Sequence, residues 1–275
     1  MLGFLAGESC RTPAHLTGRP VADVLSPIPL RDVQLGGYLG RKLDLCIGNR
    51  IFAQSPTKLV EPFRHRAERS CWQTEFWGKW FLSAAAACEY AGNREWRERL
   101  RESAHEILAT QSPDGYIGNY AAGSHLKGWD VWGRKYTLLG LLAGYSLSAD
   151  PASLGGARGL ADHLLREAGP LATDIVALGL YRGMAASSVL EPVVLLHRRT
   201  GDERYLRFAE YIVARWSTSR GPRLVEKALA GVPVSRRFPR PDNWWSWENG
   251  EKAYEMMSCY TGLLELYREG RPARE

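Results

Sequence analysis

The sequence predicts an all-α fold in which antiparallel helix hairpins follow one another in a curved array or a closed toroid. Apolar residues recur at helical spacing in four long segments of the 275-residue chain, and a more polar amphipathic helix follows three of them. Strand signals are scarce. Hairpins repeated about every 50–70 residues are typical of helical arrays and toroids, so we expect about eight or nine helices in residues 31–270 and no substantial sheet.

The chain is expected to begin with an arm and to continue as one domain. Residues 1–30 are punctuated by Pro and Gly, which interrupt helices, and are predicted to form an extended N-terminal arm. Residues 31–275 are predicted to form the helical domain. Its first part contains two helix patterns, "VQLGGYLGRKLDLCIGNRIFAQ" and "TKLVEPFRHRAE".

Four repeated segments set the order of the hairpins that follow. Their first helices are "FWGKWFLSAAAACEYAGN", "VWGRKYTLLGLLAGYSLSAD", "ASSVLEPVVLLHRRTGD" and "KAYEMMSCYTGLLELYREG". The second helices of the first three are "REWRERLRESAHEILATQ", "PASLGGARGLADHLLREAG" and "ERYLRFAEYIVARW". Because the first helices are apolar on all sides and the second helices carry charges on one side, we expect the first to be buried and the second to face solvent.

The turns inside the hairpins carry helix-start signals. Asn93, Asp150 and Asp202 stand where an N-cap is needed, and Pro151 follows its cap at the first helical position. The fourth first helix has no polar partner after it, so we expect the helix at about 250–268 to expose an apolar face and to favour self-association. The residues of that face are Leu263, Leu264, Leu266 and Tyr267.

Composition and charge exclude several classes of function. The chain is 45% hydrophobic and 24% charged, which is ordinary for a globular protein. Its net charge of +6 is spread over many short runs, which argues against a nucleic-acid-binding surface. There is no apolar run of membrane-spanning length, and the opening "MLGFLAG" lacks the basic start of a signal peptide. We therefore expect a cytoplasmic protein with no nucleic-acid or membrane partner.

The cysteines indicate free thiols. There are five of them, with no adjacent pair and no Cys-x-x-Cys spacing, which argues against a disulfide framework and against a self-contained zinc site. The five are Cys10, Cys46, Cys71, Cys88 and Cys259. Among the histidines, those placed inside the predicted helices are interpreted as structural: His105, His163 and His197.

The stretches that precede the first helices suggest a binding site. In a repeated antiparallel array all first helices begin at the same rim. The preceding stretches are "CWQTEFWGKW", "HLKGWDVWGRKY", "YRGMAASS" and "PDNWWSWENGEKAYE", and three of the four alternate Trp with charged residues. Indole rings stack on sugar faces, and charged side chains bond to hydroxyls. Convergence of these stretches therefore predicts a carbohydrate site.

The candidate sugar-binding side chains come from three of these stretches. They are Trp77, Lys79, Trp129, Asp130, Trp132, Arg134, Tyr136, Trp244, Trp245 and Trp247. The candidate acid or base carboxylates are Asp130, Glu248 and Glu255, because glycoside hydrolysis normally uses paired carboxyl groups. Each has an alternative interpretation: the indoles of the first two stretches can be helix packing, and Lys79 and Arg134 can pair with Glu75 or Asp130.

Long stretches of the sequence resemble the bacterial β-L-arabinofuranosidase-like proteins of glycoside hydrolase family 127. The resemblance covers about residues 28–270 and lies in "QTEFWGKWFLSA", "QSPDGYIGNY", "WDVWGRKYTLLGLLAGY", "YRGMAASSVLEPVVLLHRRTGDERYLRFAEYIV" and "WWSWENGEKAYEMMSCYTGLLELY". It implies an (α/α)6 toroid with a sugar site where the inner helices begin. It also implies a plant-type oligosaccharide or glycoside as ligand.

The sequence departs from the family pattern at the catalytic residues. Complete members are expected to bind zinc through a Glu-x-Cys and a Cys-Cys pair, and one of those cysteines is the nucleophile. The resemblance places these downstream of the last helix pattern, and Met257 stands where a Glu would be needed near Cys259. We therefore expect no zinc, metal or other cofactor in this chain. Lys252 and Ala186 replace inner-helix histidines of the sugar site, which makes Lys252 a further sugar-binding candidate.

The sequence thus favours a partial α/α-toroid domain of a glycosidase, the front part of a longer hydrolase. We expect weak sugar binding without turnover by this chain alone. Two alternatives remain open. One is a non-catalytic sugar-binding module to which a partner supplies further helices. The other is a metal-free uronyl hydrolase or sugar epimerase that uses Asp130, Glu248 or Glu255.

Overall fold

The computed structural model describes residues 21–238 and 252–270 and contains no β-strand in those ranges. The α-helices are α1 (Gly37–Cys46), α2 (Pro56–His65), α3 (Thr74–Ala91), α4 (Arg94–Leu108), α5 (Asp130–Ser148), α6 (Pro151–Glu167), α7 (Met184–Ser187), α8 (Leu190–Thr200), α9 (Glu203–Trp216), α10 (Leu224–Leu229) and α11 (Ala253–Arg268). Nine of these described helices have ten residues or more. The all-helical prediction is therefore confirmed.

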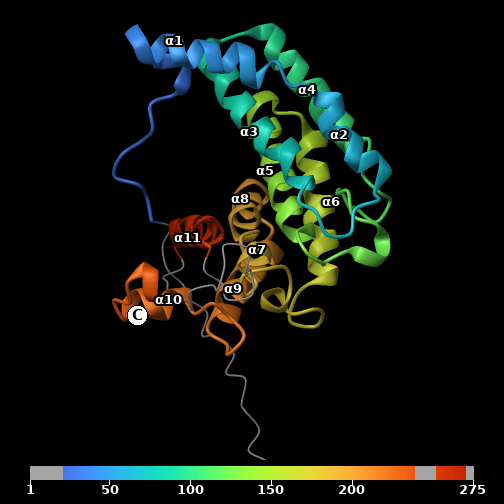
Figure 1. Cartoon of the computed structure of the whole chain (residues 1–275), viewed down its shortest axis with the longest axis vertical. Helices are drawn as coiled ribbons and strands as arrows, with labels where there is room; N and C mark the ends of the chain where they lie inside the picture. Colours follow the sequence, from blue (N-terminus) through green and yellow to red (C-terminus); the bar gives the residue numbers. More distant parts are fainter. Residues whose placement is uncertain (1–20, 239–251, 271–275) are drawn as a thin grey trace, which may run out of the picture.

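The helices form two layers that follow a curve (Figure 1). The first helices of the hairpins, α3, α5, α8 and α11, pack side by side in sequence order and form the inner layer. The second helices α4, α6 and α9 pack on the outside of their partners. The contact between α3 and α5 is the most extensive of the fold. This arrangement brings the starts of the inner helices to one end of the array, as the sequence predicted.

Local capping explains where the outer helices begin. The side chains of Asn93 and Asp202 accept hydrogen bonds from the backbone N–H groups of Trp96 and Arg204, each at 3.0 Å. Asp150 accepts from Ala152 in the same way, and Pro151 is the first residue of α6. These bonds satisfy N–H groups that have no partner within the helix. The three predicted caps are confirmed.

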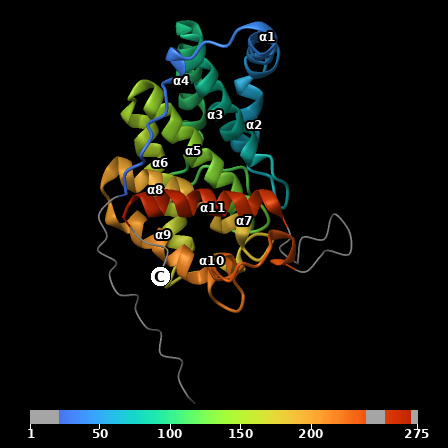
Figure 2. The ribbon, with the colours of Figure 1, turned by 90° about the vertical axis from the view of Figure 1, so that its left-hand side faces the viewer.

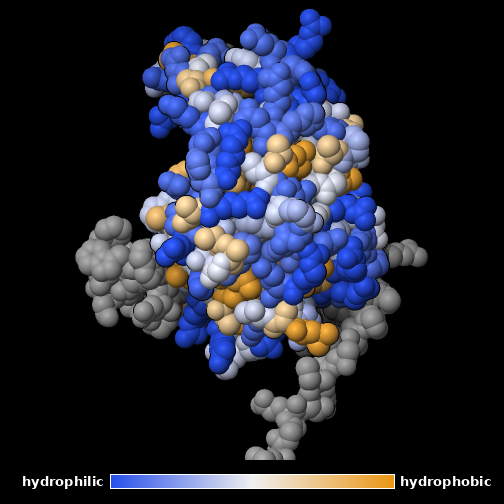
Figure 3. All heavy atoms as spheres, turned by 90° about the vertical axis from the view of Figure 1, so that its right-hand side faces the viewer, coloured by the Kyte–Doolittle hydropathy of each residue, from blue (hydrophilic) through white to orange (hydrophobic). Residues whose placement is uncertain are grey.

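The inner and outer helices differ in burial as their sequences predicted. Fourteen of the nineteen residues of α5 are buried, whereas only four of the fifteen residues of α4 are. The side of the molecule that carries α2 and α6 is mostly hydrophilic, with scattered hydrophobic residues (Figure 3). Apolar side chains of the outer helices therefore turn inward onto the first layer.

The third inner segment is divided rather than continuous. It forms α7 and α8, with a turn at Ser188 and Val189 between them. Pro192 has no N–H to donate to the Ser188 carbonyl, and in an unbroken helix its ring would also clash with that carbonyl. The proline therefore ends the helical hydrogen bonding at this point, and α8 begins just after the turn.

The segment before α1 connects the two ends of the inner layer (Figure 2). The backbone N–H of Val21 donates to the Arg268 carbonyl at 3.1 Å, and Arg268 pairs with Asp23 at 3.0 Å. At the other end of the segment, the N–H of Leu35 donates to the hydroxyl of Tyr90 in α3. These contacts hold the segment between α3 and the end of α11. Its residues 21–29 lie outside any helix.

The apolar face predicted for the last helix is exposed in part. Leu264 and Tyr267 of α11 are exposed and Leu263 is half-buried, but Leu266 is buried. The expectation for Leu266 was wrong, because α11 packs on α8 and Leu266 belongs to the same buried cluster as the apolar residues of that helix. Self-association through this face stays a prediction. Within the described ranges, no helix combines the length and the apolar character needed to cross a membrane.

Candidate functional site

Five aromatic rings meet where the inner helices begin, and we call them the ring cluster: Trp129, Trp132, Tyr136, Tyr181 and Tyr254. The ring of Trp132 lies edge-on to three of the others, at centroid distances of 5.9, 5.3 and 5.4 Å from Trp129, Tyr136 and Tyr254. Trp129 also contacts Tyr181 at 6.0 Å. Residues three and four apart share a helix face, which is why α5 presents Trp129, Trp132 and Tyr136 together. The cluster therefore joins α5, α11 and the turn before α7.

Lys79 of α3 ties the ring cluster to the next inner helix. Its Nζ lies 4.7 Å above the Tyr136 ring and 5.0 Å above the Tyr254 ring. The same ammonium pairs with Glu75 at 2.9 Å. A cation over aromatic faces is attracted by the negative charge of the ring faces. Lys79 is only half-buried, so part of its side chain remains open to a ligand.

A second lysine closes the inner side of the cluster. The Nζ of Lys135 lies 5.0 Å from the centroids of both Trp132 and Tyr136. It is 3.6 Å from the carboxylate of Glu191 in α8. Burial lowers the pKa of Lys135 and raises the pKa of Glu191, because both charges lose solvation. Lys135 is almost wholly buried and therefore supports the rings rather than a ligand.

The hydroxyl groups of Tyr136 and Tyr254 form a short contact between α5 and α11. Their oxygens are 2.6 Å apart, so one hydroxyl donates to the other. Burial is the main cause that raises the pKa of Tyr136, and the bond to Tyr254 adds to it. Tyr254 remains about half exposed although its hydroxyl is tied. Its ring is therefore a fixed surface that solvent can reach.

Among the described residues, Glu255 is the sequence-predicted acid that is buried without an ion pair. Its side chain is 2% exposed, and Oε2 has no hydrogen-bond partner in the described part of the chain. Desolvation raises its pKa, and the charge of Glu75 adds to this, while Lys252 and Lys79 oppose it. Burial therefore shifts Glu255 toward its neutral form relative to an exposed carboxyl, and the neutral form is the one that can donate a proton.

We expect Glu255→Gln to stabilise the protein at pH 7 and to have little effect at pH 4. The pKa of Glu255 is higher in the folded protein than the ordinary value of 4.5. The stabilisation that comes from binding this proton is therefore fully present below the ordinary pKa and is lost as the pH rises through the folded pKa. Glutamine is neutral at both pH values and removes the loss. Urea unfolding of both proteins at each pH measures the difference, with exposed Glu203→Gln as control. An equal difference at both pH values would contradict a raised pKa.

Two of the indoles predicted to stack on a sugar, Trp77 and Trp132, are buried in the structure. Trp77 is fully buried, and its indole N–H donates to the Ser103 hydroxyl at 3.1 Å in the core between α3 and α4. Trp132 belongs to the cluster, but it is 2% exposed and lies between the two lysines. The expectation that these two indoles stack on sugar is corrected: Trp77 packs in the core, and Trp132 supports the other rings.

Asp130 and Arg134 are also corrected, because they pair with each other behind the ring cluster. Both side chains are fully buried, at an N–O distance of 2.5 Å. The Tyr116 hydroxyl and the backbone N–H of Leu126 also donate to Asp130, each at 2.8 Å. Arg134 further bonds to Glu167 at 2.6 Å. A carboxylate saturated in this way holds the fold and is not available as acid or base.

The remaining candidates divide into two groups. Lys79, Trp129 and Tyr136 lie in or beside the ring cluster, and the Nζ of Lys252 lies 5.6 Å above the Tyr181 ring. The other four lie outside the described residues: Trp244, Trp245, Trp247 and Glu248.

Sequence reasoning missed two members of the ring cluster, Tyr181 and Tyr254. Tyr254 stands at the start of a predicted helix, and its exposed position there could have drawn attention to it. Tyr181 has no such signal. It begins a turn in which Tyr181, Arg182 and Gly183 all have positive φ, at 56°, 54° and 74°. A side chain disfavours this backbone region, so the turn persists only because its surroundings hold it.

Within residues 21–238 and 252–270, one group of side chains could hold a metal ion: His125, His163 and Glu167. One ligand atom from each lies within 4.8 Å of the others. However, Nη1 of Arg134 is 2.6 Å from Glu167 and 3.2 Å from Nδ1 of His163. Nδ1 of His163 also lies 3.2 Å from the Glu167 carboxylate, so the three candidate ligands are engaged with one another and with Arg134. The structural interpretation of His163 therefore fits this network.

The described residues also do not fit the zinc-thiolate site that the family resemblance implies. The thiol of Cys259 is fully buried and donates to the Met184 carbonyl at 3.4 Å. Burial raises its pKa to about 12, so the thiol is protonated near neutral pH in this structure and is not an activated nucleophile. The candidate metal group in the described part of the chain contains no cysteine.

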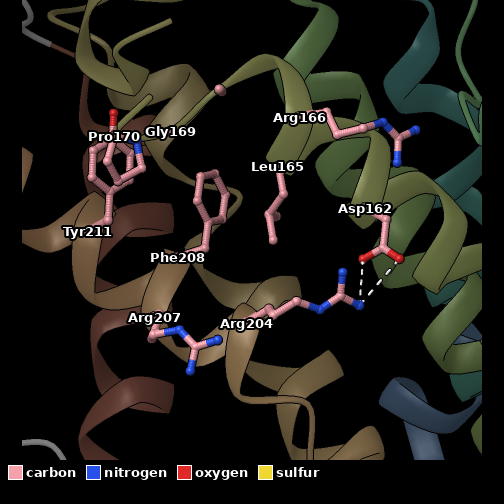
Figure 4. Close-up of a pocket in the computed structure, with 10 residues that line it drawn as sticks. Asp162, Leu165, Arg166, Gly169, Pro170, Arg204, Arg207, Phe208 and Tyr211 are labelled. Carbon is pink, nitrogen blue, oxygen red and sulfur yellow. Dashed lines mark hydrogen bonds and ion pairs between the residues drawn. The ribbon is translucent and has the colours of Figure 1, made fainter. Parts of the chain in front are cut away.

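A hollow of about 510 Å³ between α6 and α9 is not a comparable site (Figure 4). Leu165, Phe208 and Tyr211 line it, with arginines around them. Arg204 is held by Asp162, Arg166 donates to the backbone carbonyl of Asp114, and Arg207 lies on the opposite side of the hollow from Arg166, so no polar groups converge. The ring cluster combines accessible aromatic surface, ammonium groups and a buried carboxyl with a raised pKa, and is the better candidate.

Comparisons with known proteins agree with the architecture. A family model described as the GH127 catalytic domain of β-L-arabinofuranosidase matches residues 48–228. The solved structure of the GH127 β-arabinofuranosidase BT3674 aligns with a TM-score of 0.63 and 18% identity, over 88% of this chain and 40% of that one. A GH127 β-L-arabinofuranosidase from Geobacillus stearothermophilus T6 aligns with a TM-score of 0.62 and 15% identity, over 85% and 41%. No curated protein matches the sequence.

Proposed function

The chain belongs to the family of GH127 β-L-arabinofuranosidase catalytic domains, and from this premise we propose that it binds a glycoside at the ring cluster. The observation that supports the proposal is the meeting of aromatic rings, ammonium groups and a buried carboxyl with a raised pKa where inner helices begin. The chain spans about two fifths of the length of the solved structures it matches. Any enzymatic activity of a complete family member is therefore proposed, not shown, for this chain.

Each accessible group of the cluster has a role in this proposal. The exposed faces of Tyr254 and Trp129 stack on the C–H groups of a sugar ring. The ammonium groups of Lys79 and Lys252 donate to its hydroxyls. We propose a β-L-arabinofuranoside, in the form of a plant-type oligosaccharide or glycoside, as the ligand. The alternative, a non-catalytic sugar-binding module, would bind the same ligand and leave its glycosidic bond intact.

The role that we propose for Glu255 is to protonate the leaving group of the glycoside. A neutral carboxylic acid can transfer its proton to the glycosidic oxygen as the bond to the anomeric carbon breaks. Cleavage also needs a nucleophile at that carbon, and the described residues offer none that is activated, since Cys259 holds its proton. We therefore propose binding by the described residues and no hydrolysis by a zinc-thiolate route.

The test compares two exposed tyrosines of the same helix. Tyr254 in the cluster is 49% exposed, and Tyr267 near the other end of α11 is 44% exposed. We expect Tyr254→Ala to weaken the binding of methyl β-L-arabinofuranoside by roughly 0.5–1.5 kcal/mol, because a stacking surface is lost. Tyr267→Ala should leave affinity unchanged. Calorimetric titration measures both after their unfolding curves have been compared.

Two results would contradict the proposed function. The first is no binding of the arabinofuranoside, or equal binding of an unrelated glucoside, by the unaltered chain. The second is the same affinity in both tyrosine variants, which would place the sugar away from the ring cluster.

A further inference from the structure

A row of three indoles leads from the buried part of the ring cluster out to solvent. Trp132 is 2% exposed, Trp129 is half-buried, and Trp72, in the loop before α3, is 48% exposed. The rings of Trp72 and Trp129 lie edge to face, with centroids 6.4 Å apart and planes at 77°. Trp129 is therefore shared between the ring cluster and a second aromatic surface that Trp72 presents to solvent.

The hydroxyl of Tyr120 holds the two outer indoles in register. It donates to the backbone carbonyl of Cys71 at 2.8 Å and accepts from the backbone N–H of Trp129 at 3.1 Å. The carbonyl belongs to the residue just before Trp72, and the N–H belongs to Trp129 itself. Tyr120 is fully buried, so neither bond competes with water. One side chain thus fixes the spacing of two loops that are far apart in the sequence.

The loop that carries Trp72 is also fixed from its other side. The carboxylate of Glu68 accepts backbone hydrogen bonds from Arg69, Ser70 and Cys71 at 2.7, 2.8 and 2.9 Å. These bonds lower the pKa of Glu68, because they favour its charged form. Trp72 is therefore an exposed indole on an ordered loop. Its exposed ring is a fixed, flat apolar surface of the kind that stacks on the C–H groups of a sugar.

We propose that Trp72 stacks on a second ring of the ligand, one unit outward from the sugar held at the ring cluster. The inference rests on the proposed function and narrows it: the preferred ligand is an oligosaccharide of at least two sugar units, not a single sugar. Trp72 supplies the outer stacking surface, and Trp129 supports it edge-on. Tyr120 acts as a positioning residue for Trp72 and for Trp129, since it touches the two loops and not the ligand, so its loss affects both sugar units.

The experiment measures affinity for one sugar and for two. Methyl β-L-arabinofuranoside and a β-linked arabinofuranose disaccharide are titrated into the unaltered chain, Trp72→Ala and Tyr120→Phe. We expect the disaccharide to bind more tightly than the monosaccharide, and both variants to lose about two- to tenfold in disaccharide affinity. Monosaccharide affinity should stay unchanged in Trp72→Ala. The exposed ring of Tyr38 on α1 serves as control, through Tyr38→Ala.

The outcomes separate this inference from the function on which it rests. Equal disaccharide affinity in the unaltered chain and in Trp72→Ala overturns the outer surface while sugar binding stands. Equal weakening of monosaccharide and disaccharide binding in Trp72→Ala shows general distortion and also overturns it. If an aryl arabinofuranoside depends on Trp72 and the disaccharide does not, the second ring is an aromatic leaving group and not a sugar. Failure of all three ligands to bind overturns the proposed function itself.

Discussion

Replacing Arg134 by methionine is expected to lower the free energy of unfolding by about 3–5 kcal/mol, because it leaves a buried carboxylate without its positive partner. Arg134 is fully buried and bonds to Asp130 at 2.5 Å and to Glu167 at 2.6 Å. Its guanidinium also lies 4.6 Å from the centroid of the Tyr116 ring. Methionine fills a similar volume, so the loss reports the charge and the hydrogen bonds rather than a cavity. Urea unfolding gives the difference.

The matched control is Arg204→Met. Arg204 also contacts two carboxylates, those of Asp202 at 2.7 Å and Asp162 at 3.2 Å, but its side chain is 47% exposed. Water screens this pair, so we expect a change of about 0–1 kcal/mol. Losses of similar size in the two variants would mean that burial does not decide the strength of these ion pairs, and that the Arg134 network is not a main support of the fold.

The second large effect is expected from Gly78→Ala in α3. A Cβ at this position would overlap the backbone carbonyl of Tyr136 in α5. The carbonyl belongs to the helix and cannot rotate away, so α3 and α5 must separate where Lys79 reaches the Tyr136 ring. We expect a loss of about 2–3 kcal/mol in unfolding free energy, although alanine is the better helix former. Arabinofuranoside affinity should fall as well.

Gly155→Ala in α6 is the control for helix propensity. A Cβ there would meet no atom within 4 Å, so the substitution should stabilise the protein by about 0.5–1 kcal/mol. Urea unfolding of the two alanine variants compares them directly. If Gly78→Ala were as stabilising as Gly155→Ala, the close approach of the inner helices in this structure would be wrong.

The helices and their starting points could be predicted because their causes are local in the sequence. Apolar spacing within about eighteen residues defines each helix, and a single side chain such as Asn93 or Asp202 caps the next one. The division between α7 and α8 also has a local cause, Pro192, which is visible in the sequence. The same local patterns carried the family resemblance and predicted a site at the start of the inner helices.

The membership of the site depended on contacts between distant segments. Trp77 and Trp132 each lie near the start of an inner helix and look alike in sequence. Yet Trp77 faces Ser103 in the core, whereas Trp132 meets Tyr254, 122 positions further along the chain. The role of Tyr120 is even harder to predict, because its hydroxyl bonds to two backbone groups, those of Cys71 and Trp129. No spacing rule within one segment contains this information.

The sequence by itself determined an all-α hairpin array, its caps, its family and the end of the array where ligands would bind. The tertiary structure alone decided what each polar group does there. Asp130 and Glu255 both stand at the start of an inner helix, and both were candidates for acid or base chemistry. Asp130 meets Arg134 and is fixed, whereas Glu255 is buried without such a partner and its pKa rises. The physical reason is that the free energy of a buried charge depends on every neighbour that replaces water, and those neighbours come from other helices.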